Sequence, residues 1–216
     1  MYLWYSSPMS QAVAQKPPSN RDRLLDLAEQ LVLQKGFAST SIEELIVGVG
    51  ITKSGFFYHF KDKNDLAKAL MQRYLEADTQ VLDDIFNRAA ELHDDPLHSF
   101  LIGLKLFAEM MAEVYDVHPG CLTASVCYQD QLFDQDVRAL NEEGILAWRK
   151  RFGDHFAAIA ERYPPKVEVD LDSLADSMMA VVEGGIILSK SLKDRKALPA
   201  QIMHFRNYVR LLFGAD

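Results

Sequence analysis

Residues 40–66 read TSIEELIVGVGITKSGFFYHFKDKNDL, and this stretch predicts the fold of the N-terminal part of the chain. Ser41, with a glutamate three residues later, forms a capping box that begins a short helix. Gly50 permits a sharp turn after this helix, because glycine adopts backbone conformations that other residues avoid. Thr52 can cap a second short helix that runs to about His59. Two short helices joined by such a turn form a helix-turn-helix, whose second helix can enter the major groove of double-stranded DNA.

The second helix of this motif carries residue types that suit a contact with DNA. Small and hydroxyl-bearing residues at its start allow close approach to the sugar-phosphate backbone, and Lys53 adds a positive charge. The apolar residues Leu45, Ile46 and Ile51 are expected to hold the two helices together. The alternative interpretation is a purely structural helical hairpin with a solvated lysine face. The residues predicted to contact DNA are Thr40, Thr52, Lys53, Ser54, Gly55, Phe57, Tyr58, His59 and Lys63.

Signals for further helices recur on both sides of this stretch, and no strand alternation of useful length occurs. We therefore predict an all-α fold, with a three-helix DNA-binding head and a helical-bundle body for ligand binding and dimerisation. The predicted domains are a disordered arm over 1–19, the head over 20–61 and the body over 62–216. Outside the motif, helices are predicted near 20–35, from 62 through 75, and near 95–117, 121–129, 134–163, 170–192 and 199–213.

The charge of the 216-residue chain is unevenly distributed. The formal net charge is −8, which by itself argues against binding to nucleic acid. Residues 1–70, however, contain eight Lys and Arg against seven Asp and Glu, so almost all the negative charge follows residue 70. A slightly basic head on an acidic body is compatible with DNA binding by the head alone.

The cysteine usage and the terminal sequence favour a cytoplasmic protein without cofactors. Two cysteines, Cys121 and Cys127, are too few for a disulfide framework. They lie six positions apart and so do not share one helix face; even with His118 nearby, no metal site is expected. No signal peptide is evident, and Lys105 and Glu109 interrupt the most apolar stretch of the chain.

The predicted body is rich in bulky, adaptable side chains. Aromatic and methionine side chains at helical spacing usually form a core, yet their excess here also favours a cavity for an effector. Cys121 follows a Pro-Gly break and could be a sensor thiol stabilised by Lys190, or simply a core cysteine. Cys127 is expected to lie mid-helix, where desolvation disfavours the thiolate. The predicted effector-pocket residues are Phe100, Leu104, Phe107, Met111, Cys121, Trp148, Phe152 and Met178.

The helix-turn-helix stretch resembles the DNA-binding signature of the TetR family of transcriptional regulators. The resemblance covers residues 20–70, and the segments PGCLTASV and VVEGGIILSKSL resemble a subset of the family. The family often has tyrosine where this chain has Phe57, so the phosphate contact of that hydroxyl is absent here. The residues that match position by position are Gly50, Ile51, Thr52, Lys53, Phe57, His59, Phe60 and Lys63.

The resemblance implies a homodimer on a pseudo-palindromic operator, with a small-molecule effector between the body helices. Release of a repressor by its effector is the usual mechanism in the family. The resemblance places the dimer interface on the helices near 134–163 and 170–192, where the small residues Ala180 and Gly184 permit close approach. The alternative function is a small-molecule binding protein with a vestigial head. An enzyme is not expected, because no nucleophile-base pairing or phosphate loop is evident.

Overall fold

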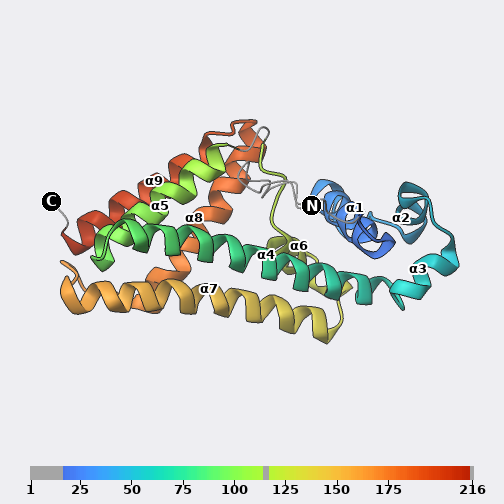
Figure 1. The fold of residues 1–216 in the computed structure, drawn as a ribbon, viewed down its shortest axis with the longest axis horizontal. Coiled ribbons are helices and arrows are strands. Elements are labelled where there is room, and N and C mark those ends of the chain that lie inside the picture. Colours follow the sequence, from blue (N-terminus) through green and yellow to red (C-terminus); the bar gives the residue numbers. More distant parts are fainter. Residues whose placement is uncertain (1–16, 114–116, 215–216) are drawn as a thin grey trace. The chain divides into compact units, whose positions relative to one another are not determined.

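The computed structural model describes residues 17–113 and 117–214, so most of the predicted arm over 1–19 lies outside the described residues. All regular structure in these two ranges is helical, which confirms the predicted all-α fold (Figure 1). The α-helices are α1 (Asn20–Lys35), α2 (Ile42–Val49), α3 (Lys53–His59), α4 (Lys63–Leu92), α5 (Pro96–Ala112), α6 (Leu122–Tyr128), α7 (Gln135–Arg162), α8 (Leu171–Leu192) and α9 (Ala197–Phe213). A short 3-10 helix, η1 (Asp130–Leu132), follows α6.

The chain divides into two compact units. The head unit comprises residues up to 77 together with 121–142, and the body unit comprises 78–120 together with 143–216. The long helices α4 and α7 each supply residues to both units. The head unit therefore differs from the predicted domain over 20–61, because it also includes the start of α4, all of α6 and the start of α7.

Helix α6 and the start of α7 belong to the hydrophobic core of the head unit. Leu122 and Val126 on α6 are buried in the same cluster as Leu24 of α1 and Leu45 of α2. The ring of Phe133, just before α7, lies 4.5 Å from the ring of Phe37. The core that supports the helix-turn-helix is thus built from two separate stretches of the chain.

In the body unit, α9 packs against both α5 and α8, as Figure 1 shows. The close packing of α8 on α9 requires a glycine: a Cβ added to Gly185 would lie 2.8 Å from Cδ1 of Leu198. At the start of α5, the Asp95 carboxylate caps the backbone N–H groups of Leu97 and His98, each at 3.1 Å. It also accepts a 2.7 Å hydrogen bond from the Tyr163 hydroxyl, which ties α5 to the end of α7.

Helix α5 ends at Ala112, before the predicted end near residue 117. The sequence offers no helix-breaking residue until Pro119, so periodicity alone could not show the earlier end. Within residues 17–113 and 117–214, no helix is long and apolar enough to cross a membrane.

Candidate DNA-binding surface and body pocket

The turn between α2 and α3 has the geometry that the sequence predicts. Gly50 lies in the left-handed region with φ 74° and ψ 39°, where a residue with a Cβ would be strained. Its N–H donates to the carbonyl oxygen of Ile46 at 3.0 Å and ends α2. The hydroxyl of Thr52 accepts a 3.1 Å hydrogen bond from the backbone N–H of Gly55 and caps α3. The predicted helix-turn-helix is confirmed.

Helix α3 has one buried and one exposed face. Phe56 is fully buried in the core of the head unit. Lys53 and Phe57, four residues apart, both lie on the exposed side, and so do Ser54 and Tyr58, with Tyr58 84% exposed. This face therefore presents an ammonium group, two hydroxyl groups and two aromatic rings to solvent. These groups can bind phosphate oxygens and contact base edges in a DNA groove.

Two of the predicted DNA contacts have structural roles within the head unit. Thr40 is only 1% exposed, and its hydroxyl donates to the carbonyl oxygen of Gly36 at 3.0 Å. The Lys63 ammonium donates to the carbonyl oxygen of Phe37 at 2.5 Å and lies 4.2 Å from the centre of the Phe37 ring. Burial lowers the pKa of Lys63. Both side chains stabilise the loop between α1 and α2, so their polar groups are engaged within the head unit.

The other predicted contacts lie on or beside α3. Thr52 is exposed, but its hydroxyl is bonded to Gly55 and lies 2.9 Å from the hydroxyl of Ser54. Gly55 is half-buried, and its backbone N–H donates to the capping hydroxyl of Thr52. His59 is also half-buried, and its ring makes an edge contact with Tyr58 at 5.0 Å. The exposed set on α3 is therefore Lys53, Ser54, Phe57 and Tyr58.

Most of the predicted effector-pocket residues pack in the core of the body unit. The rings of Phe100 and Phe152 are fully buried, with their centres 6.2 Å apart. Leu104, Phe107 and Met178 are also buried, and Met111 is half-buried. Trp148 lines the body pocket described below. The helical spacing of these side chains is thus explained largely by a close-packed core.

The two cysteines both belong to the head unit. Cys121 is half-buried and accepts a hydrogen bond from the Tyr74 hydroxyl at 3.7 Å. Cys127 is exposed, so the expectation that it is desolvated was wrong. The predicted helix is there, but Cys127 faces outward, and its sulfur accepts a 3.2 Å hydrogen bond from Asn141. Among the described residues, no cluster of three or more His, Cys, Asp or Glu side chains could hold a metal ion.

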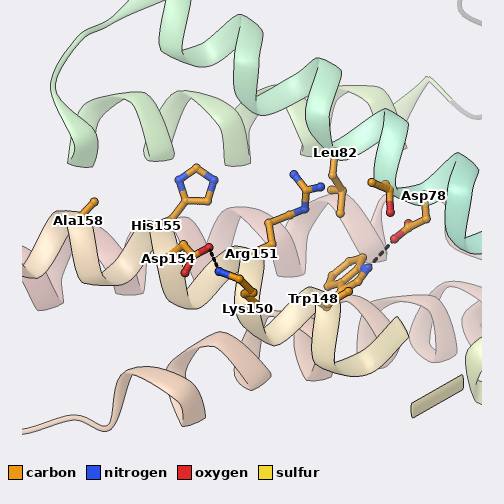
Figure 2. A pocket seen from close by; sticks show the side chains of 10 residues that line it. Asp78, Leu82, Trp148, Lys150, Arg151, Asp154, His155 and Ala158 are labelled. Atoms are coloured by element: carbon orange, nitrogen blue, oxygen red, sulfur yellow. Dashed lines mark hydrogen bonds and ion pairs between the residues drawn. The ribbon is translucent and has the colours of Figure 1, made fainter. Parts of the chain in front are cut away.

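A pocket of about 500 Å³ opens between α4 and α7 within the body unit (Figure 2). Asp78, a half-buried carboxylate in this pocket, accepts a 2.5 Å hydrogen bond from the indole N–H of Trp148. Burial raises the pKa of Asp78 to about 6, even though the Trp148 hydrogen bond and the Arg151 charge oppose the shift. The pocket is lined by Asp78, Thr79, Leu82, Ala147, Trp148, Lys150, Arg151, Asp154, His155 and Ala158.

Asp78 is expected to destabilise the body unit at neutral pH. Its pKa in the folded chain is raised above that of an unfolded aspartate, so stability falls as the pH rises from about 4 to 6. Asp78→Asn keeps an acceptor for the Trp148 N–H but removes the charge. In urea unfolding at pH 7.5 we expect the variant to be more stable by about 1–3 kcal/mol, and by less at pH 4.5.

The control for this prediction is Asp154→Asn. Asp154 is an exposed carboxylate of the same pocket, and it pairs with Lys150 at 2.7 Å on the same helix. We expect this variant to change stability by less than about 0.5 kcal/mol, because exposed pairs contribute little. An Asp78→Asn protein that is less stable than the parent at pH 7.5 would contradict the expectation that the Asp78 charge destabilises the folded chain.

Known proteins share both the motif and the fold. The sequence profile of bacterial regulatory proteins of the tetR family matches residues 24–70, from α1 into α4. The transcriptional regulator AcuR of Cereibacter sphaeroides is 24% identical over 193 residues, which cover 83% of this chain and 85% of AcuR. The transcriptional repressor NemR of Escherichia coli K12 is 26% identical over 125 residues, which cover 57% of this chain and 60% of NemR.

The fold extends the likeness beyond the helix-turn-helix. The crystal structure of a TetR-family transcriptional regulator from Agrobacterium tumefaciens matches with a TM-score of 0.74 at 19% identity. The match covers 89% of this chain and 98% of that protein, so the head and the body both have counterparts. The head therefore carries the DNA-binding domain of the tetR family of bacterial regulatory proteins, and most of the chain is similar to transcriptional regulators that contain this domain.

Proposed function

We propose that this regulator is a homodimeric repressor that acts in the cytoplasm on a pseudo-palindromic DNA operator. The observation that carries the proposal is the exposed face of α3, where Lys53, Ser54, Phe57 and Tyr58 lie together on the second helix of a helix-turn-helix. Lys53 and Ser54 would bind phosphate oxygens. Phe57 has no hydroxyl for a phosphate, but its ring can contact a thymine methyl group.

Two copies of the chain are needed for specific recognition. A helix as short as α3 reads only a few base pairs, and two-fold symmetric dimers double this number by binding two half-sites. The dimer would hold its two α3 helices about 34–36 Å apart, or a multiple of that distance, to match successive major grooves.

The proposed dimer interface includes the outer face of α8. A Cβ added to Gly184 would meet no atom within 4 Å, although the next residue, Gly185, is tightly packed on α9. Ala180, one turn before Gly184, is exposed. Because α9 packs beside α8 and also exposes apolar side chains, we propose α9 as the second interface helix in place of the predicted helix near 134–163. The large apolar side chains that these two helices expose are Ile187, Leu188, Leu192, Tyr208 and Leu211.

An effector would act by changing the spacing of the two heads. A ligand that binds one conformation of the dimer better than another shifts the population toward that conformation. If the favoured conformation no longer matches successive major grooves, the affinity for DNA falls. The pocket between α4 and α7 is a candidate for the effector site, because α4 is one continuous helix that supplies residues to both units.

Salt dependence of DNA binding tests the repressor proposal. The probe is a duplex that the full-length protein enriches from a randomised DNA pool. For a dimer with about eight phosphate contacts, a plot of log K against log salt concentration should have a slope near −7. A protein that enriches no sequence, or one whose affinity does not depend on salt, would instead support a small-molecule binding protein with a vestigial head.

A further inference from the structure

The charged groups of the body pocket are unequally paired. Lys150 pairs with Asp154 at 2.7 Å, and Arg151 pairs with Asp83 at 2.6 Å. Asp83 does not line the pocket, and Arg151, although paired with it, still lowers the pKa of Asp78 through its charge. The remaining lining carboxylate, Asp78, has a neutral hydrogen-bond partner, the indole N–H of Trp148.

His155 does not supply the missing positive charge. Its ring lies 5.0 Å from the ring of Phe86 and 5.3 Å from the ring of Phe100. Burial lowers the pKa of His155, so the imidazole is neutral at physiological pH. The pocket thus contains one carboxylate whose charge is not matched by an ion pair.

The geometry leaves part of the Asp78 carboxylate available to a ligand. The indole N–H of Trp148 donates to Oδ2 of Asp78. Within the described residues, no group donates a hydrogen bond to Oδ1 of Asp78. Figure 2 shows the Asp78 side chain on α4 facing Trp148 on α7, with Leu82 one turn further along α4. The aromatic ring of Trp148 and the side chains of Leu82, Ala147 and Ala158 give the pocket apolar surface beside this carboxylate.

We infer that this pocket binds organic cations, in which an ammonium or amidinium group contacts Asp78 and an apolar body contacts Trp148 and Leu82. A cation would compensate the desolvated carboxylate, as a charge-assisted hydrogen bond does elsewhere in proteins. Its volume of about 500 Å³ is in the range of pockets that bind small molecules. The inferred cation site follows from the residues of the pocket alone. Only the expected effect of a bound cation on DNA affinity rests on the proposed function.

The carboxylate also has the character of a binding group, because it is half-buried without an ion-pair partner and is therefore expected to oppose folding. A buried charge without an ion-pair partner costs stability, and such costs concentrate at functional sites. Asp78 begins the part of α4 that belongs to the body unit, and residues before it belong to the head unit. A cation on Asp78 would therefore act directly on the helix that is common to both units.

The inference is tested with three probes that share one apolar body. These are 4-phenylbutylammonium, 4-phenylbutanol and 4-phenylbutyrate, each titrated into the full-length protein with Trp4→Phe, so that Trp148 is the remaining tryptophan of the two. Binding is followed by Trp148 fluorescence and by calorimetry. We expect the ammonium probe to bind at least about tenfold more tightly than the alcohol or the carboxylate.

Matched variants then locate the charge that makes this preference. Asp78→Asn is expected to remove the preference for the ammonium probe, while Asp154→Asn, which changes the exposed carboxylate of the same pocket, keeps it. Because Asp78→Asn is expected to stabilise the chain, its loss of binding would not reflect unfolding. Equal affinity of the parent for all three probes, tighter binding of 4-phenylbutyrate, or an unchanged preference in Asp78→Asn would overturn the inference.

The effect on DNA is measured separately. We expect a saturating concentration of the ammonium probe to weaken binding to the enriched duplex, and to have no such effect on Asp78→Asn. If the probe binds through Asp78 while the affinity for DNA is unchanged, the cation site stands and the effector step of the proposed function fails. If the probe does not bind through Asp78, the inference of a cation site is wrong, but the proposal that α3 binds DNA still holds.

Discussion

Replacing Lys53 by alanine is expected to weaken DNA binding by about ten- to a hundredfold, since a dimer loses two charge-assisted contacts of roughly 1 kcal/mol or more each. The Lys53 ammonium lies at the start of α3, on the exposed face of the helix-turn-helix. The measurement is a fluorescence anisotropy titration with the enriched duplex at several salt concentrations. The slope of log K against log salt concentration should become less negative by about 2, one unit for each lost phosphate contact.

The matched control is Lys63→Met in the same head unit. The Lys63 ammonium is already bonded to the carbonyl oxygen of Phe37 and packed on the Phe37 ring. Methionine keeps the apolar stem but loses this hydrogen bond, so thermal stability should fall while the salt slope stays near that of the parent. A larger change of salt slope for Lys63→Met than for Lys53→Ala would show that the contacts have been assigned to the wrong lysine.

Replacing Gly184 by arginine is expected to convert the dimer into monomers. Nothing within one chain opposes a side chain at this position, because an added Cβ meets no atom within 4 Å. In the proposed dimer, the same side chain would place two unpaired charges in a close helix contact, at a cost of several kcal/mol. Light scattering of the variant at micromolar concentration should give the mass of one chain, near 24.5 kDa.

Two further substitutions separate the interface from the fold. Gly184→Ala adds little volume, so it should leave the dimer intact. Gly185→Ala places a Cβ against the backbone of Leu198, at 3.0 Å from its Cα, and should lower stability by about 1–3 kcal/mol in overpacking strain. A Gly184→Arg protein that keeps the mass of two chains would place the interface elsewhere.

The helix-turn-helix could be predicted from the sequence because its signals are local. The cap at Thr52, the left-handed turn at Gly50 and the buried Leu45 lie within a few residues of one another. Each follows from the requirements of a single backbone hydrogen bond, a single φ angle or a single helix face. In the folded chain the packing of the other helices leaves this local turn and cap as predicted.

The pocket could not be predicted in this way, because its decisive contact joins residues far apart in the chain. Asp78 and Trp148 meet only when α4 and α7 are packed together, and no spacing rule links them. The stripe of Phe100, Leu104 and Phe107 is included in the predicted effector cavity, but these side chains pack as core, since periodicity marks a buried face without showing whether space remains there. Nor can spacing show that the Lys63 ammonium is held within the head unit.

The participation of α6 in the core of the head unit limits how this regulator can be divided. A DNA-reading segment cut after residue 77 would leave behind Leu122, Val126 and Phe133, each of which buries apolar surface worth roughly 1.5–3 kcal/mol. The helix-turn-helix is therefore not expected to fold stably when it is transferred to another protein without residues 121–142. A chimera that exchanges operator specificity between two such proteins would have to include residues 121–142 from the same parent as the helix-turn-helix. Recombination at the end of α3 alone would separate α3 from part of the hydrophobic core that supports it.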